Sequence, residues 1–283
     1  MTGTLYDRTA SAAAAAVISA YSTSFGLATR LLGVRVRGHV RNVYALVRVA
    51  DEIVDGEAAA AGLSLDAQRR TLDALEEETL DAMSSGFSAN LVVHAFALTA
   101  RECGITPEHV RPFFASMRTD LETASHDAAS HDDYVYGSAE VVGLMCLQVF
   151  ANAGRPDAPI PAPAALVTGA RRLGAAFQDI NFLRDLADDA GLLGRDYLGV
   201  TDGSTRATVL DRIDADLDAA AETISLLPAD CRAAVTAAHD LFAALATRLR
   251  TAVGDERVRV PDPVKAIIAA RAVAGRPPVR RAS

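Results

Sequence analysis

Two segments of this 283-residue chain carry the pattern Asp-x-x-x-Asp on an apolar helical background. One segment runs from Tyr44 to Asp55, and the other runs from Gln178 to Asp189. At about 100° of rotation per residue, the polar residues of each segment fall within an arc of roughly 60° to 80°. These residues are Tyr44, Arg48, Asp51 and Asp55 in the first segment and Gln178, Asn181, Asp185 and Asp189 in the second.

Such acidic faces are costly unless a cation binds to them. Like charges at i,i+4 destabilise an isolated helix by about 0.2–0.5 kcal/mol per pair. If the two helices faced each other across a cavity, the repulsion would grow unless cations lay between the carboxylates. Carboxylates suit hard cations, and Mg²⁺ commonly binds through one or two carboxylates together with substrate phosphates. The four aspartates therefore predict a Mg²⁺ cluster (with Mn²⁺ as an alternative), to which Asn181 adds a neutral oxygen.

An arginine precedes the first aspartate of each pair. Arg48 and Arg184 can bind phosphate oxygens in a bidentate manner. Together with the cations they would form a clamp that stabilises diphosphate as a leaving group. A pocket that loses diphosphate must tolerate a carbocation, so we expect the rest of it to be apolar and dry.

The composition favours an all-α protein. Half of the residues are hydrophobic, aromatic residues make up only 5%, and tryptophan does not occur. Long stretches of Ala, Leu, Arg, Glu and Asp with few β-branched runs favour helix over strand. The formal net charge of −8 and the lack of a basic stripe argue against nucleic acid as a partner.

Apolar spacing, caps and turn residues predict a series of helices within one domain, residues 1–283. We expect helices at 8–29, 36–55, 65–83, 90–103, 107–123, 134–153, 163–190, 205–225, 229–253 and 261–274. The Pro-rich stretch 154–163 is the clearest loop. A single bundle that brings both Asp pairs together explains the pattern better than two halves, and we expect its ends, 1–20 and 275–283, to be mobile.

The cysteines and the N-terminal sequence indicate a cytoplasmic protein. Cys103, Cys146 and Cys231 form no CxxC pair and are typical of buried thiols in a reducing compartment. The N-terminus lacks the basic start and apolar core of a signal peptide. The apolar runs 12–18 and 141–150 are too short to span a bilayer.

Four motifs occur in order between about residues 22 and 198. They are Ser22-Thr-Ser24-Phe25 with Ala28-Thr-Arg30-Leu-Leu32, Tyr44-Ala-Leu-Val-Arg48 with Asp51 and Asp55, Tyr134-Val-Tyr136 with Ala139, Val142 and Gly143, and Gln178, Asn181, Arg184-Asp185 and Asp189 with Arg195-Asp-Tyr197-Leu. Together these motifs resemble those of the squalene and phytoene synthase family of head-to-head prenyl transferases. The resemblance implies an α-helical isoprenoid synthase bundle around one deep central cavity.

The resemblance also implies roles for individual residues. Mg²⁺ would bind to Asp51, Asp55, Asn181, Asp185 and Asp189. The residues expected at the two prenyl diphosphate sites are Tyr21, Ser22, Thr23, Ser24, Tyr44, Arg48, Gln178, Asn181 and Arg184. The hydrocarbon cavity would be walled by Phe25, Ala139, Val142 and Gly143, with Tyr134 near the reacting carbons.

The implied reaction joins two allylic diphosphates through a cyclopropyl diphosphate intermediate. Our primary expectation is a Mg²⁺-dependent phytoene synthase that uses two geranylgeranyl diphosphates and needs no NADPH. The proton acceptor is left open among released diphosphate, Tyr44 and Tyr134. The alternatives are a farnesyl diphosphate-using synthase of squalene, hydroxysqualene or a C30 carotenoid precursor, a terpene cyclase, and, from another class, a non-catalytic helical partner protein.

Several residues depart from the family pattern. Glu52 replaces a second Asp, Thr23 replaces a Lys, and Gly199 replaces a Pro. Glu140 stands where Gly is usual, so its charge must face away from the cation pocket or be paired. Basic residues in the C-terminal tail suggest transient association with a membrane during product release.

Overall fold

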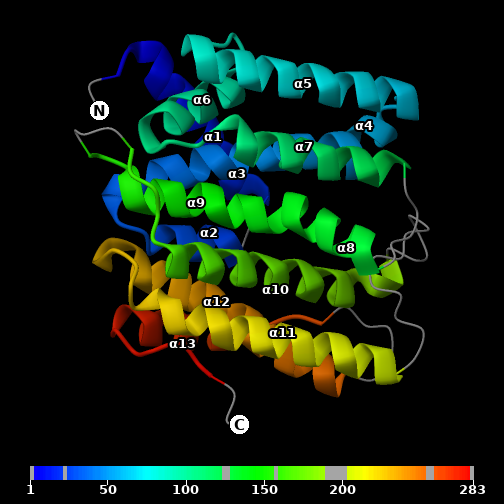
Figure 1. Cartoon of the computed structure of the whole chain (residues 1–283), viewed down its shortest axis with the longest axis vertical. Coiled ribbons are helices and arrows are strands. Elements are labelled where there is room, and N and C mark those ends of the chain that lie inside the picture. Colours follow the sequence, from blue (N-terminus) through cyan, green and yellow to red (C-terminus); the bar gives the residue numbers. More distant parts are fainter. Residues whose placement is uncertain are drawn as a thin grey trace.

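The computed structural model describes residues 3–21, 24–122, 128–155, 159–188, 203–252 and 258–280, and within these ranges all regular secondary structure is helical (Figure 1). The helices are α1 (Leu5–Tyr21), α2 (Ser24–Arg30), α3 (Val34–Asp55), α4 (Glu57–Ala60), α5 (Leu65–Ser85), α6 (Leu91–Cys103), α7 (Pro107–Glu122), α8 (Ala128–Val135), the π-helix η1 (Tyr136–Glu140), α9 (Val141–Asn152), α10 (Ala164–Asp188), α11 (Gly203–Ile224), α12 (Ala229–Thr251) and α13 (Asp262–Val273). The predicted all-α class is confirmed.

Local sequence signals set several of the helix ends. Ser64 caps α5, where its side chain accepts a hydrogen bond from the backbone N–H of Ala67 at 3.3 Å. Asn90 caps α6 by accepting from Val92 and Val93. Gly104 ends α6 at a φ of 75°, a left-handed conformation that glycine adopts without steric cost. Pro107 then opens α7, where its missing N–H costs nothing.

Two predicted helices differ from the structure. The opening helix expected at 8–29 is described as two helices, α1 and α2, on either side of residues 22–23. The helix expected at 134–153 begins earlier, at Ala128, and contains the π-helix η1. A close contact accompanies this π-helix, because a Cβ on Gly137 would lie 2.3 Å from the carbonyl oxygen of Pro112. The spacing of apolar residues along one segment cannot predict a contact with a distant segment, so it did not predict the π-helix.

The helices stack in layers along the long axis of the molecule (Figure 1). At one end, α5 packs on α6 and α7, while α1 packs on α3 and α6. In the middle, α9 contacts α3, α7 and α10. At the other end, α10 packs on α11, α11 on α12, and α12 on α13. The helices α3, α9 and α10 therefore lie at the centre of the stack.

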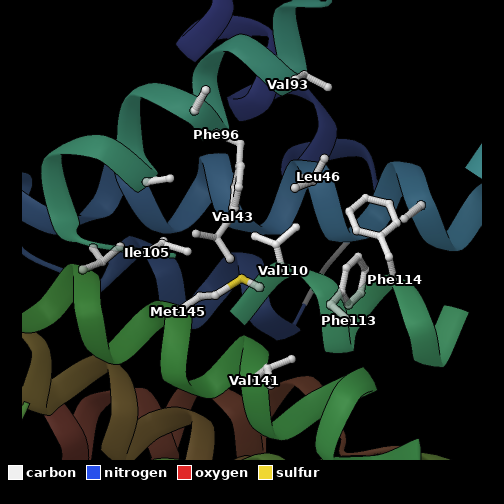
Figure 2. Close-up of a cluster of buried hydrophobic side chains, with 14 of the residues drawn as sticks. Val43, Leu46, Val93, Phe96, Ile105, Val110, Phe113, Phe114, Val141 and Met145 are labelled. Atoms are coloured by element: carbon white, nitrogen blue, oxygen red, sulfur yellow. The ribbon is translucent and has the colours of Figure 1, made fainter. Parts of the chain in front are cut away.

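Two large apolar clusters hold these layers together. The first joins α3, α5, α6, α7 and α9, and Figure 2 shows Phe96 and Leu46 pointing into it with Val110 and Met145. The second joins α10, α11, α12 and α13 around Ile180 and Ile213. Phe113 and Phe114, which Figure 2 also shows, are fully buried in the first cluster.

One continuous helical stretch, Ser130–Asn152, is long and apolar enough to cross a membrane by length and composition. In the bundle its apolar residues pack against α3, α7 and α10 or face an internal cavity. This stretch is therefore the central helix of the bundle in this structure.

We expect Phe96→Ala to lower the free energy of unfolding by about 3–5 kcal/mol, since its ring is completely buried and would leave a cavity. The matched control is Phe87→Ala, because the Phe87 side chain is 59% exposed and its loss should cost less than about 1 kcal/mol. Urea titration of both variants checks the difference. Equal midpoints for the two variants would contradict the assigned core.

Candidate active site

A cavity of about 330 Å³ lies between the two apolar clusters. Its walls come from α1, α2, α3, η1, α9, α10, α11 and α12, and most of the residues that form them are aliphatic. None of the described residues that line it is charged. Polar side chains enter mainly at one end, from Tyr44, Gln178 and Asn181. The cavity therefore has the largely apolar interior that a carbocation requires.

Small residues bring the walls of the cavity close together. A Cβ on Gly174 of α10 would lie 2.8 Å from the carbonyl oxygen of Ala139 in η1. A Cβ on Gly143 of α9 would lie 2.8 Å from the carbonyl oxygen of Ala170. Both contacts are with backbone atoms, so the helices could not keep these distances with larger residues. Gly174 thus sets the spacing between α10 and η1, and Gly143 sets the spacing between α9 and α10.

The two Asp segments lie at the same end of the bundle. Figure 1 shows that α3 and α10 run in the same direction, so their C-terminal ends lie together. Val47 on α3 and Asn181 on α10 both line the cavity. Asp51 and Asp185 each follow one of these residues by four positions, which places each of them on the same helix face about 6 Å further along the axis.

Each of these carboxylates is paired with an arginine of its own helix. Arg48 donates from Nη1 to Asp51 at 2.7 Å and from Nη2 to Glu52. Arg184 donates from Nε to Asp185 at 2.9 Å and also pairs with it through Nη2. Each helix thus pairs its carboxylates with an arginine at this end of the cavity, and α3 carries more carboxylates here than arginines.

Arg48 occupies a partly desolvated position. Its guanidinium lies 4.5 Å from the ring centroid of Tyr21, within cation–π range. Burial would lower its pKa, but the carboxylates of Glu52 and Asp51 outweigh that effect, and the pKa of Arg48 is raised. Its Nε is buried and has no hydrogen-bond partner in the described part of the chain. Arg48 is thus a fixed cation with a donor left for an anionic ligand.

The donor set at this end fits a hard divalent cation. Asp51 and Asp185 supply carboxylate oxygens, and Asn181 supplies an amide oxygen. Among the described residues, no three His, Cys, Asp or Glu side chains converge on one point. Asp189, the fourth predicted carboxylate, lies outside the described residues. The chemistry of the donors therefore matches Mg²⁺, while the predicted ligand set stays a prediction.

The structure brings together most of the predicted site residues that it describes. Tyr44, Ala139, Val142, Gly143, Gln178 and Asn181 line the cavity. Tyr21, Arg48, Arg184 and Asp185 belong to its polar end, whereas Asp55 is exposed at the end of α3. Ser22 and Thr23 lie outside the described residues, and of Ser24 and Phe25 only the backbone, in α2, is described. The binding and catalytic roles of all these residues stay predictions.

Tyr134, which the resemblance places near the reacting carbons, does not line the cavity, and its catalytic role stays a prediction. Its hydroxyl donates to the buried Asp120 at 2.9 Å, and its ring packs 5.9 Å from that of Phe182. The motif spacing did not indicate this orientation because Asp120 approaches from another helix, α7.

The departures from the family pattern find local partners. Glu140 is paired with Arg171 and does not line the cavity, which satisfies the expectation that its charge be paired or turned away. Glu52 is held by Arg48, and its Oε2 also accepts from the backbone N–H of Glu57 at 3.2 Å. Each carboxylate therefore has a cationic partner, and neither lines the apolar cavity.

Sequence reasoning missed most of the cavity wall, and three of the missed residues bear on its chemistry. Ser138 lines it with an Oγ that is buried and lacks a partner among the described residues. Phe177 lines it while stacking on Phe242 at a centroid distance of 3.8 Å. Cys146 lines it four residues after Val142, a spacing on one helix face that could have revealed it. Burial raises the pKa of the Cys146 thiol to about 12, so it stays protonated.

Comparison with known proteins matches residues 18–206 to the squalene/phytoene synthase family. The chain is 29% identical to a 15-cis-phytoene synthase of a Paracoccus species, over 81% of this chain and 78% of that protein. It is 30% identical to a phytoene synthase of Rhodobacter capsulatus, over 84% and 72%. The match to an Arthrospira platensis phytoene synthase, also 30% identical, covers 66% of this chain and 60% of that protein.

Solved structures share the fold. A dehydrosqualene synthase in complex with ligand superposes with a TM-score of 0.78 at 22% identity, over 95% of this chain and 97% of that one. A squalene synthase of Alicyclobacillus acidocaldarius gives 0.74 at 20% identity, over 88% and 96%. The helical bundle around a central cavity is thereby confirmed.

We expect the native thiols to react with iodoacetamide at pH 8 at least 100-fold more slowly than the same thiols in urea. Burial raises the pKa of each of the three cysteines to about 12, which lowers the thiolate fraction roughly a thousandfold from the ordinary value. Peptide mass spectrometry over time measures each site separately. Fast labelling of Cys146 in the native protein would show that the cavity is wet.

Proposed function

This chain belongs to the squalene/phytoene synthase family, and we propose that within it the protein is a phytoene synthase. In this proposal the enzyme joins two geranylgeranyl diphosphates head to head in a Mg²⁺-dependent reaction. As a member of the family it is a prenyltransferase of isoprenoid biosynthesis. The chain length of its substrates is a further part of the proposal, and the length of the cavity supports geranylgeranyl diphosphate as that substrate.

The proposed reaction has two stages, each of which releases one diphosphate. The first substrate loses diphosphate to give an allylic cation, which the C2–C3 double bond of the second substrate attacks. Loss of a proton then closes a cyclopropane ring on a C40 diphosphate. The second stage breaks the remaining C–O bond, and the cation rearranges to a 1-1′ linkage. Loss of another proton gives phytoene without any reductant, so no NADPH is needed.

The length of the cavity wall is the observation that favours a C20 substrate over a C15 substrate. The lining residues of α10 extend from Leu166 to Asn181, fifteen residues apart, which is about 22 Å of helix. An extended carbon chain advances roughly 1.2 Å per bond, so a geranylgeranyl main chain spans about 18 Å and a farnesyl chain about 13 Å. A farnesyl chain would leave a large part of this wall uncovered, whereas a geranylgeranyl chain would cover most of it.

The polar end of the cavity would receive the diphosphate groups. Arg48 and Arg184 hold Asp51 and Asp185 in the ligand-free protein. When diphosphate arrives, their guanidinium groups can turn N–H donors toward its oxygens and leave the carboxylate oxygens to Mg²⁺. The bound cation would supply Lewis-acid stabilisation of the leaving diphosphate. Tyr21, which packs on Arg48, would keep that guanidinium in place.

The apolar walls would protect the cation between ionisation and proton loss. Protonated Cys146 offers no thiolate to capture it, and the ring of Phe177 offers a π face. For the proton acceptor, Tyr44 lines the cavity and Tyr134 donates its own proton to Asp120. This arrangement favours Tyr44 or released diphosphate over Tyr134 in the proposal.

We also propose that the enzyme works in the cytoplasm and associates transiently with a membrane that accepts the C40 hydrocarbon. The oligomeric state does not enter the proposal.

Incubation of the purified protein with Mg²⁺ and either farnesyl or geranylgeranyl diphosphate tests the proposed function. We expect a C40 hydrocarbon from geranylgeranyl diphosphate and at least tenfold less head-to-head product from farnesyl diphosphate, as measured by mass spectrometry of extracted lipids. Consumption of farnesyl diphosphate alone would favour the C30 synthases. A cyclic product from a single substrate would favour a terpene cyclase, and no product would favour a non-catalytic partner.

We expect Asp51→Ala and Asp185→Ala each to lower kcat by at least 10³-fold, because each removes a carboxylate that the proposed clamp requires. The control is Asp66→Ala, since Asp66 is an exposed aspartate in the first turn of α5. Circular dichroism melting should show all three variants folded. Near-normal turnover in either of the first two variants would contradict the metal-clamp proposal.

A further inference from the structure

A second hollow, of about 420 Å³, opens on the surface at the end of the bundle that lies away from Asp51 and Asp185. It lies between the start of α3, the end of α9 and the turn from α11 to α12. Of the described residues, Phe150 alone lines both this hollow and the central cavity. Phe150 is therefore the residue at which the cavity and the outer hollow adjoin.

On the cavity side, Phe150 completes an apolar end wall. It packs against the buried cluster of Leu147, Leu166, Ile224 and Leu227. These residues come from the C-terminal parts of α9 and α11, the N-terminal part of α10 and the turn from α11 to α12. Tyr44 and Asn181 line the opposite end of the cavity. A prenyl chain whose diphosphate lies at the polar end would thus reach Phe150 with its last isoprene unit.

The backbone of Phe150 is fixed by Arg35. Arg35 donates from Nη2 to the carbonyl oxygen of Phe150 at 3.1 Å and from Nη1 to that of Ala153 at 2.9 Å. It also binds Asp230 of α12 through Nε at 3.0 Å and Nη2 at 2.9 Å. Carbonyl groups at the end of a helix lack partners within the helix, and the N–H groups of Arg35 satisfy two of them here. Because Arg35 also forms a bidentate ion pair with Asp230, it joins α9 to α3 and α12.

The charges of this contact support its rigidity. The hydrogen bond from Arg35 is the largest cause that lowers the pKa of Asp230, and the same bond raises the pKa of Arg35. Both groups therefore stay charged at neutral pH. Gly33 adds a backbone hydrogen bond to the carbonyl oxygen of Asp230 at 2.8 Å. The segment that carries Phe150 is held by three helices rather than by α9 alone.

We propose that Phe150 is a specificity-determining residue, the end wall that sets the longest prenyl chain the cavity admits. The inference rests on the proposed function in one respect, since it requires a prenyl diphosphate to lie with its head group at the polar end. Replacing Phe by Ala removes six ring carbons, which roughly matches the five carbons of one isoprene unit. The opened wall would let a chain extend by one unit into the outer hollow.

The variant Phe150→Ala tests the end wall by competition between geranylgeranyl diphosphate and the C25 geranylfarnesyl diphosphate, in the presence of Mg²⁺. We expect the ratio of kcat/KM for the C25 substrate over the C20 substrate to rise at least tenfold above the ratio of the unchanged protein. If the unchanged protein uses farnesyl diphosphate, the same shift is expected from C15 to C20. An unchanged ratio in a variant with an unchanged melting temperature overturns the proposal.

Two further variants separate the end wall from a general loss of packing. In the double variant Phe150→Ala with Ala151→Trp, the indole should fill the outer hollow and return the ratio at least halfway to its original value, since Ala151 lines that hollow. Phe87→Ala, which removes an exposed ring far from the cavity, should leave the ratio unchanged. If Phe150→Ala does not fold, Phe150→Leu should shift the ratio in the same direction by a smaller factor.

A binding assay distinguishes failure of this inference from failure of the proposed function. Calorimetric titration of the unchanged protein and the variant with C15, C20 and C25 diphosphates and Mg²⁺ reports the admitted length without turnover. If the unchanged protein makes no head-to-head product, the proposed function fails, and a tenfold gain in affinity for the longer chain still supports the end wall. No gain in either assay overturns the end wall whatever product the enzyme makes.

Discussion

The separation of charge from apolar surface along one cavity is the constraint on which the rest of this structure depends. A carboxylate or guanidinium that leaves water without a partner costs several kcal/mol, so the charges must be paired and kept at one end. The helices α3 and α10 achieve this because both run in the same direction and both place Arg and Asp at their C-terminal ends, beyond the apolar residues that line the cavity. The pairs Arg48–Asp51 and Arg184–Asp185 lie beyond the lining residues, and no charged side chain among the described residues lines the interior.

The packing around the cavity serves the same separation. Glycines in α9 and α10 let two backbones approach, and a volume remains beside them that aliphatic side chains line but do not fill. The large apolar clusters on both sides hold the walls apart, since each has its own buried contacts. Arg35 and Asp230 close the far end through bonds to helix-terminal carbonyl groups rather than through charges in the cavity. The polar end thus contains Arg48 and Arg184, whereas Arg35 at the far end binds groups of the protein itself.

Much of the fold and part of the site could be predicted from the sequence, because both depend on local periodicity. Caps such as Asn90 and turns such as Gly104 gave helix ends within a few residues. Tyr44, Gln178 and Asn181 share helix faces with the aspartates, and the structure places all three on the cavity wall. The position of Tyr134 could not be predicted, since its hydroxyl bonds to Asp120 of a helix that precedes it in the chain. The π-helix and the partner of Glu140 likewise depend on packing between distant segments.

By itself, the sequence determined that the chain is helical, which faces of two helices carry carboxylates and arginines, and which family it resembles. Those properties follow from rotation per residue and from side-chain chemistry, which are local. Only the tertiary structure decided that α3 and α10 point the same way, that Cys146, Phe177 and Ser138 complete the wall, and that Phe150 stands between the cavity and an outer hollow. The Asp-x-x-x-Asp pattern shows which carboxylates lie on one face of a helix. The distance across which two such faces act is set by glycine contacts and apolar clusters, whose members lie far apart in the chain.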